Sequence, residues 1–362
     1  MTTAIYKHFF LGFLFLSQFI FAQKGLEALI ISDGVLLKCD NSKLPRDGSI
    51  ELPRTVNRIA KEAFKDCLPL KSISIAGTVT TIEEGAFSGC TNLTKVEILP
   101  NSVTYIGARA FANCSKLLII YLPNSVTNIG EEAFRGCSSL KKIEIPENVS
   151  ELGNRAFMDC SGLQQVNFLG EKLSVISSQL FYQCKQLQKA VLPESVKNIR
   201  SSAFAYCENL SSVTFPKQLE SIGDDAFEYC RRLTSIDIPD SVVFVGASAF
   251  NSCSSLMKVK LPYGLRHILN DTFLDCTSLT AVVIPDTVEK INIQAFKNCS
   301  SLVRVQMPLA LTNIYYAAFY GCKSLQYIDL PDEVKYIGGF AFGECQNIRT
   351  VELPKAVTVI AS

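Results

Sequence analysis

The 362-residue sequence contains no tryptophan and only two histidines, His8 and His267. Catalytic triads, histidine-rich zinc sites and general-base histidines all need an imidazole. Because His8 lies in an N-terminal leader segment, His267 is the single candidate left in the mature chain. No Cys-x-x-Cys pair and no repeated calcium-loop or phosphate-loop motif occurs in the chain. These absences argue against most enzyme classes and against a zinc site. We therefore expect a protein that is not an enzyme and that holds no cofactor or metal.

The chain also has almost no net charge. Its 35 lysines and arginines face 34 acidic residues, and removing Lys7 with the leader leaves 34 of each. A neutral chain has no global field with which to hold a phosphate backbone, so we expect no nucleic-acid partner. Apolar residues make up 48% and charged residues 19% of the chain, a composition that can bury a core and that excludes disorder.

Long apolar runs are confined to the N-terminus. Lys7 and His8 precede the apolar residues 9–16, and a second apolar stretch ends at Ala22. The run is shorter than the about 20 residues of a membrane-spanning helix. It matches the apolar region of a secretory signal peptide that is cleaved after a small residue, and we assign residues 1–22 to such a peptide. The mature chain is then expected to have no spanning segment and to be secreted or located at the cell surface.

Phenylalanine recurs at a fixed spacing through nearly all of the mature chain. Thirteen phenylalanines lie 23 residues apart, except for two steps of 24 that end at Phe111 and Phe181. A cysteine stands three residues after each of them, from Cys67 to Cys345. A period of this length is typical of solenoids, in which each unit buries its apolar face only by stacking on its neighbours. The phenylalanines are Phe64, Phe87, Phe111, Phe134, Phe157, Phe181, Phe204, Phe227, Phe250, Phe273, Phe296, Phe319 and Phe342.

One unit illustrates the structure that the pattern predicts. Ile143 and Ile145 share one face of an extended strand, whereas Lys142 and Glu144 lie on the other. Pro146 ends this strand because proline has no N–H group to donate to a neighbouring strand. Further along each unit, acidic residues follow a glycine ahead of an Ala-Phe pair, which predicts a short helical turn. Each unit is therefore expected to contain one strand and one helical turn.

Residues 125–140 form a nearly consensus unit, SVTNIGEEAFRGCSSL. With units of this sequence, the chain resembles the BspA-like leucine-rich repeat family of surface proteins, whose units read roughly LxxIxIPxxVxxIGxxAFxxC. The resemblance runs from about residue 26 to the last residue. It implies an α/β fold: a right-handed, curved leucine-rich repeat solenoid with a parallel β-sheet on its concave side and short helical turns on the return path. It also implies a secreted or surface role in adhesion.

The chain is expected to have three parts. Residues 1–22 are the signal peptide, and residues 23–50 form an N-terminal cap, in which Asp33-Gly34 between apolar runs predicts a β-hairpin turn. Residues 51–362 form the solenoid of about thirteen 23-residue units. The C-terminal unit is incomplete, because the sequence stops before the Ala-Phe and Cys positions of that unit.

Thirteen of the fourteen cysteines occupy one repeat position, so neighbours should lie about one strand spacing, roughly 4.8 Å, apart. Parallel, inward side chains at that spacing hold the Cβ atoms too far apart for a disulfide. We therefore favour a column of reduced, buried thiols. A bridge between Cys39, which is out of register, and Cys67 remains an alternative. His267 is expected to be a solvated loop residue.

The outward positions of the concave strands are the ones that the repeat leaves free to vary, and a repeat scaffold builds its binding face from such positions. Leu118, Ile119 and Tyr121 form an apolar group on a face that is otherwise polar. We select them as partner-binding residues, with Tyr327 as a distant second contact. The expected partner is an extended protein, such as an extracellular-matrix or cell-surface protein. The alternative is a structural surface-layer or spacer protein without a dedicated ligand.

Overall fold

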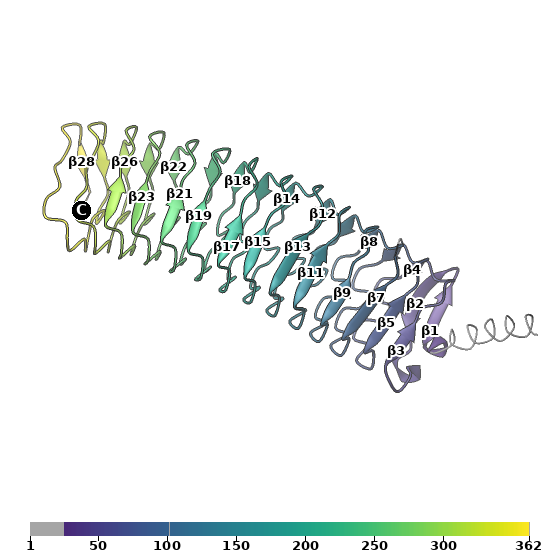
Figure 1. Cartoon of the computed structure of the whole chain (residues 1–362). Coiled ribbons are helices and arrows are strands. Elements are labelled where there is room, and N and C mark those ends of the chain that lie inside the picture. The colour runs from purple at the N-terminus through teal and green to yellow at the C-terminus, as the bar shows by residue number, and fades with distance from the viewer. Residues whose placement is uncertain (1–24, 101, 362) are drawn as a thin grey trace, which may run out of the picture.

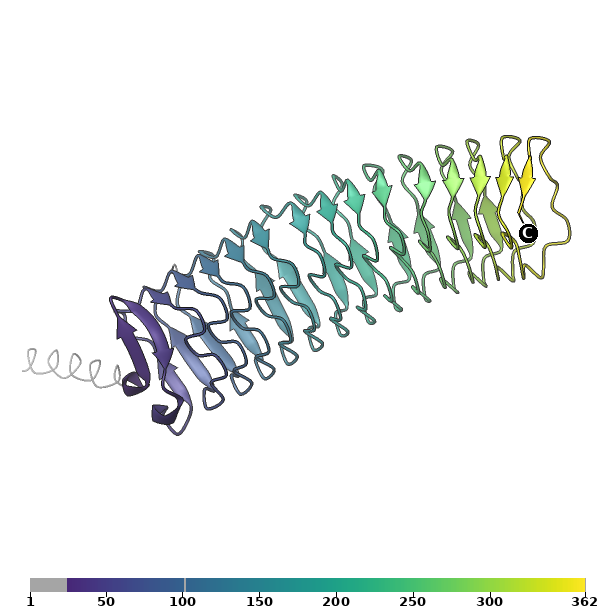
Figure 2. The same cartoon turned by 180° about the vertical axis from the view of Figure 1, so that it is seen from behind.

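The computed structural model describes residues 25–100 and 102–361, so the signal peptide assigned to residues 1–22 lies outside the described residues. The chain forms a long, gently bent rod of stacked coils, with the first coils at one end and the last at the other (Figures 1 and 2). Each coil is one repeat of 23 or 24 residues. No helix among the described residues is long and apolar enough to cross a membrane.

Most coils contribute one strand to each of two faces of the rod, and the coils after β25 contribute only the short strand. The long strands are β3 (Ser49–Glu51), β5 (Ser72–Ile75), β7 (Lys95–Ile98), β9 (Ile119–Tyr121), β11 (Lys142–Ile145), β13 (Gln165–Phe168), β15 (Lys189–Val191), β17 (Ser212–Thr214), β19 (Ser235–Asp237), β21 (Lys258–Lys260), β23 (Ala281–Val283) and β25 (Arg304–Gln306). The short strands are β4 (Arg58–Ile59), β6 (Thr81–Ile82), β8 (Tyr105–Ile106), β10 (Asn128–Ile129), β12 (Glu151–Leu152), β14 (Val175–Ile176), β16 (Asn198–Ile199), β18 (Ser221–Ile222), β20 (Phe244–Val245), β22 (His267–Ile268), β24 (Lys290–Ile291), β26 (Asn313–Ile314), β27 (Tyr336–Ile337) and β28 (Val359–Ile360).

Within each sheet, strands of successive coils pair in parallel and in register. The long strands form four consecutive sheets, which begin at β3, β11, β19 and β23, and the short strands form three, of which the last two begin at β14 and β22. In the long-strand sheet of β5 and β7, Ile73 lies beside Val96, and in the short-strand sheet of β6 and β8, Ile82 lies beside Ile106. All of these side chains are buried. The predicted parallel-sheet solenoid is thus confirmed, and the structure adds a second, short-strand sheet to each coil.

An antiparallel hairpin precedes the first coil. It joins β1 (Leu29–Ser32) to β2 (Val35–Cys39) through Asp33 and Gly34, which have φ angles of 49° and 77°. Two central residues with positive φ are typical of a type I′ turn, whose twist matches that of the strands. β2 then pairs in parallel with β4, so the hairpin continues the short-strand sheet beyond the first coil. Two short 3₁₀ helices, η1 (Leu26–Ala28) and η2 (Asn41–Lys43), flank it.

The return path of each coil consists of consecutive turns; η1 and η2 are the only helices of residues 25–100 and 102–361, so the predicted helical turns are not confirmed. Within the first coil, the Cys67 N–H donates to the Phe64 carbonyl at 3.0 Å, an i to i−3 turn bond. Alternate N–H groups leave the coil: those of Phe64 and Asp66 donate to the carbonyls of Ala86 and Ser88 of the next coil, at 2.7 Å each, whereas that of Lys65 donates to Glu62 of its own coil at 3.0 Å. The turns are therefore joined by a third ladder of hydrogen bonds, which uses donors that a helix would need internally.

The core contains a continuous column of stacked phenylalanine rings. From Phe64 to Phe342, neighbouring ring centroids lie 4.8–5.6 Å apart with interplanar angles of 1–22°. Beside it runs the cysteine column, in which each thiol from Cys90 to Cys345 donates to the phenylalanine carbonyl of the preceding coil, as Cys160 does to Phe134 at 3.1 Å. The cysteines from Cys67 to Cys322 are buried, and Cys345 is half-buried.

One register position, directly after the aliphatic residue that ends each short strand, brings the backbones of two coils into contact where it is glycine. A Cβ atom built on Gly153 would lie 2.3 Å from the nitrogen of Glu131 and 2.4 Å from the carbonyl carbon of Gly130. Non-bonded carbon atoms prefer about 3.5–4.0 Å, so only glycine permits this approach without displacement of a coil. We call this position the glycine register. Some coils carry a side chain there and keep the hydrogen bond to the preceding coil, as Arg200 N–H does to the Ile176 carbonyl at 2.9 Å.

We predict that Gly153→Ala lowers the free energy of unfolding by about 1–3 kcal/mol, because the new methyl group overpacks the contact between coils. The matched control is Gly77→Ala, whose Cβ would approach no atom closer than 3.7 Å and which should change stability by less than about 0.5 kcal/mol. Urea unfolding followed by circular dichroism measures both. Equal stability of the two variants would contradict the close approach of the coils.

We predict that the cysteine column is reduced and unreactive in the folded protein. Burial raises the pKa of the Cys114, Cys160 and Cys253 thiols to about 12, against about 8.5 for a free thiol. Maleimide should therefore label few thiols at neutral pH until denaturant exposes all fourteen. Since the folded chain keeps these protons at a pH where the unfolded chain releases them, stability should fall as pH rises from about 9 toward 12. Native thiols that are mostly oxidised or fully labelled would contradict the buried column.

Candidate partner-binding face

The long strands place their middle residue in the core and the two flanking residues in solvent. In β7, Val96 is buried while Lys95 and Glu97 are exposed, and in β9, Ile120 is buried between Ile119 and Tyr121. Successive strands therefore present two parallel rows of outward side chains, which we call the long-strand face. Because the core rows are fixed by packing, the chemistry of this face is set by the outward residues alone.

Leu118, Ile119 and Tyr121 lie together at β9 with 53%, 38% and 63% of their surfaces exposed. We call these three residues the β9 patch. The structure thus places the sequence-selected apolar group in one coil and in solvent. Large apolar side chains exposed together mark a surface suited to contact with another molecule.

Ion pairs lie on the long-strand face on both sides of the β9 patch. Lys95 and Glu97, which are in register with Ile119 and Tyr121 on β9, form one pair with the lysine Nζ 2.9 Å from the Glu97 Oε2. In the next long strand, β11, Lys142 and Glu144 are paired at 2.7 Å, and the hydrogen bond from Lys142 lowers the pKa of Glu144. An apolar centre with a polar surround is the arrangement in which a few residues carry most of the binding energy of an interface.

Tyr327 does not join this patch. It lies nine coils further along the chain from Ile119, a distance of about 43 Å at roughly 4.8 Å per coil. The prediction placed it on an outward strand position, but the long strands end with β25 and Tyr327 lies in a segment without strand structure. Its side chain, 55% exposed, lines a small cavity of about 230 Å³ together with Leu309, which is 70% exposed. Tyr327 is therefore a separate exposed aromatic residue.

The sequence reasoning missed a larger hollow on the same face. β13 and β15 are paired only at Gln165 and Lys189, whereas four pairs join β11 to β13 and three join β15 to β17. At this opening lies a cavity of about 700 Å³, lined by Phe168, Leu169 and Val191 among others. The signal was present in the sequence as the second 24-residue step, near Leu169, but its consequence depends on how the strands separate.

Two groups with potential acid–base chemistry have structural surroundings that the sequence did not reveal. His267 was expected in a solvated loop, but it is the first residue of strand β22 and is half-buried. The buried carboxylate of Glu132 accepts a hydrogen bond from the Arg109 Nε at 2.8 Å and lies 3.5 Å from Arg135. The Arg109 hydrogen bond lowers the pKa of Glu132, so this carboxylate is held in its ionised form. No cluster of three potential metal ligands occurs in the described part of the chain.

Comparison with known proteins places the chain among bacterial repeat proteins. A leucine-rich repeat protein from Bacteroides ovatus is 34% identical, with a TM-score of 0.71 over 89% of this chain and 90% of that one. A leucine-rich cell surface protein from Faecalibacterium prausnitzii is 26% identical, with a TM-score of 0.54 over 90% and 92% of the two chains. A leucine-rich repeat protein from Eubacterium ventriosum shares the fold at 23% identity, with a TM-score of 0.57 over 87% and 86%. No curated protein matches the chain.

The family comparison agrees with the repeat pattern. The BspA type leucine-rich repeat region matches residues 48–164, 174–292 and 266–362, which together include almost the whole solenoid. The stacked phenylalanines, the cysteine column and all of the paired strands except β1, β2 and β13 lie in these matched segments. The chain is therefore a member of the BspA-type leucine-rich repeat family.

Proposed function

We propose that this chain is a secreted or cell-surface protein that binds an extended protein partner through its long-strand face, in adhesion to host or neighbouring-cell macromolecules. The observation that carries the proposal is the β9 patch, where Leu118, Ile119 and Tyr121 are exposed together between two ion pairs. The leucine-rich repeat fold is in general a protein-binding scaffold, and its uniform surface favours a long partner.

The dimensions of the face support an extended partner over a small ligand. Thirteen coils at about 4.8 Å each span on the order of 60 Å. The cavities on the long-strand face are open hollows between neighbouring coils, at Tyr327 and at the opening between β13 and β15. A partner that lies along the rod could contact the β9 patch and the hollow beside Val191 together, because they are three coils apart.

The surface location is supported by two observations. The N-terminal apolar segment has the pattern of a signal peptide, and the similar protein of Faecalibacterium prausnitzii is described as a leucine-rich cell surface protein. We further propose that the chain is not an enzyme. In support, the carboxylate of Glu132 is bound by arginines, and the sequence has a single histidine outside its leader, His267.

We predict that the double change Ile119→Asp and Tyr121→Ser weakens partner binding by about tenfold or more, the loss of one good anchor. The thermal midpoint should stay nearly unchanged, because both side chains point into solvent. The measurement is saturable binding of the full mature chain to a panel of immobilised, purified extracellular-matrix proteins, alongside circular dichroism.

The matched control is Ser212→Asp with Thr214→Ser, which introduces the same residues at equivalent exposed positions of β17. It should leave binding within about twofold of the unaltered chain, since rim residues contribute little. Binding that survives the β9 change intact would show that the patch is ordinary surface. A chain that binds no protein of the panel saturably would favour the alternative of a structural spacer.

A further inference from the structure

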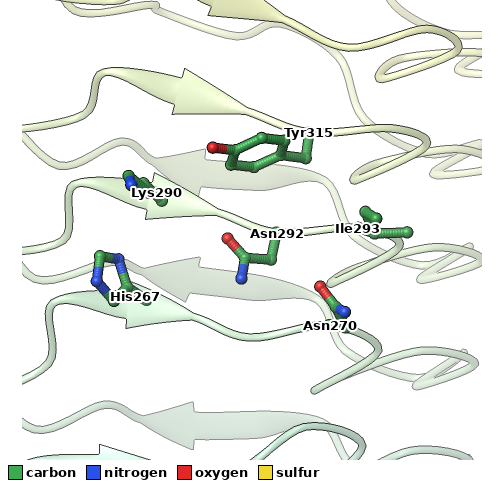
Figure 3. Close-up of a pocket in the computed structure, with 6 residues that line it drawn as sticks. All are labelled: His267, Asn270, Lys290, Asn292, Ile293 and Tyr315. Carbon is green, nitrogen blue, oxygen red and sulfur yellow. The ribbon is translucent and has the colours of Figure 1, made fainter.

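A cavity on the short-strand side of the rod collects polar side chains from three successive coils. It has a volume of about 300 Å³ and is lined by His267, Asn270, Lys290, Asn292, Ile293 and Tyr315. Figure 3 shows these side chains on β22, on β24 and in the turns after the short strands, with the Tyr315 hydroxyl directed toward the side of Lys290. The cavity is formed by the short-strand side of the coils, so it is independent of the long-strand face.

The polar groups of this cavity do not bind one another. At two other places on the short strands, polar residues in register are joined between coils: Asn128 donates to Glu151 at 2.5 Å, and Ser221 donates to Asn198 at 2.7 Å. His267 and Lys290 occupy the same register on β22 and β24, yet neither has a hydrogen bond or ion pair with any residue that the structure describes.

The same holds for the other three polar side chains. The side-chain amides of Asn270 and Asn292 and the hydroxyl of Tyr315 have no hydrogen-bond partner among residues 25–100 and 102–361, although the Tyr315 ring packs against Tyr336 at 5.5 Å. The Nδ1 atom of His267 is buried and also lacks a partner within the described chain. Buried polar atoms in native proteins are nearly always satisfied, by protein, water or ligand. The buried Nδ1 atom of His267 therefore calls for a partner from outside the described chain, and the polar groups of the other four side chains, which are partly or fully exposed, are free to bind the same molecule.

The repeat itself changes where the cavity forms. The glycine register is occupied by Gly223 and Gly246 in the two coils before it, and by Leu269, Asn292 and Tyr315 in the three coils that line it. The coils stay joined at this register, because the N–H groups of Asn292 and Tyr315 donate to the carbonyls of Ile268 and Ile291 at 2.9 Å each, the same distance as from Gly246 to Ile222. The replacements therefore change the surface chemistry: an amide and a phenol project where the repeat has no side chain.

The charges around the cavity favour an anion. The Lys290 ammonium is unpaired in the described structure, whereas the adjacent Glu289 is already paired with Arg266 at 3.2 Å. Asp271 lies next to Asn270 in the chain, and burial raises the pKa of its carboxyl group. A carboxylate in the cavity would meet an unopposed ammonium and an imidazole, and charge-assisted hydrogen bonds of this kind are the strong ones.

We propose that this cavity binds a hexuronate, the acidic sugar unit of many glycans. The carboxylate would lie against Lys290 and His267, and the sugar hydroxyls would bond to Asn270, Asn292 and Tyr315, whose amides and phenol both donate and accept. A simple anion would leave these three groups unused. The volume of about 300 Å³ is large enough for one pyranose ring, with Ile293 as an apolar wall.

The test is saturation-transfer-difference NMR on the full mature chain with sodium D-glucuronate as the probe. D-Glucose and acetate serve as the hydroxyl-only and carboxylate-only probes. Glucuronate should bind at least about tenfold more tightly than either. A tetrasaccharide of alternating glucuronate and N-acetylglucosamine distinguishes a free sugar from a glycan, and its competition with glucuronate would place both at one site.

Two substitutions connect binding to the cavity. Lys290→Gln removes the ammonium and should weaken glucuronate binding by about tenfold. Asn292→Gly restores the repeat glycine and should weaken it measurably while keeping the fold. Lys258→Gln, on a long strand, is the control that should have no effect. Glucuronate binding that equals that of glucose or acetate, or that is unaffected by Lys290→Gln in a chain with an unchanged thermal midpoint, would overturn the proposal. None of these outcomes bears on partner binding by the β9 patch.

Discussion

The hydrogen bonds between successive coils are the interaction on which the rest of this structure depends. They form three ladders along the rod: between long strands, between short strands, and between the turns, as from Phe64 to Ala86 at 2.7 Å. The two strand ladders are divided into shorter sheets, and the turn ladder also joins coils at which a strand ladder is interrupted, as from Phe134 to Ala156 at 2.8 Å. Three ladders leave a coil little freedom to shift or rotate against its neighbour. Each side chain is thus held beside the equivalent side chain of the next coil, which is why phenylalanine stacks on phenylalanine and each thiol meets the same carbonyl.

This constraint explains why the interior could be predicted and the return path could not. Ile143 and Lys142 alternate with a period of two, so their inward and outward directions follow from strand geometry alone. The Ala-Phe segment carries signals that are equally compatible with a helical turn. Its actual form is decided by where the N–H groups of Phe64 and Asp66 find acceptors, and those acceptors belong to another coil. Because the conformation of the segment depends on hydrogen bonds to the next coil, it cannot be derived from the sequence of one coil.

The candidate sites were predictable to the same extent. The exposure of Leu118, Ile119 and Tyr121 follows from the strand pattern, and the structure places them as an exposed group. Tyr327 was assigned by the same pattern but lies where no strand forms. The hollow between β13 and β15 depends on how these strands separate, and the cavity at His267 depends on how side chains from three coils are placed beside one another. Their sequence signals, an added residue near Leu169 and a missing glycine at Asn292, indicate where the repeat changes but not the shape that results.

Departures from the repeat therefore carry the information that distinguishes this chain from an idealised solenoid. A conforming outward residue, such as Lys95, is neutralised by its neighbour, and a conforming glycine, such as Gly153, holds two coils in contact. Each departure removes one of these arrangements and leaves surface or hydrogen-bonding groups without a partner in the chain. Burial in the phenylalanine and cysteine columns on the inside of the same coils offsets the local loss. The rigid core thus permits unsatisfied groups at the surface, and such groups are what an external ligand can bind.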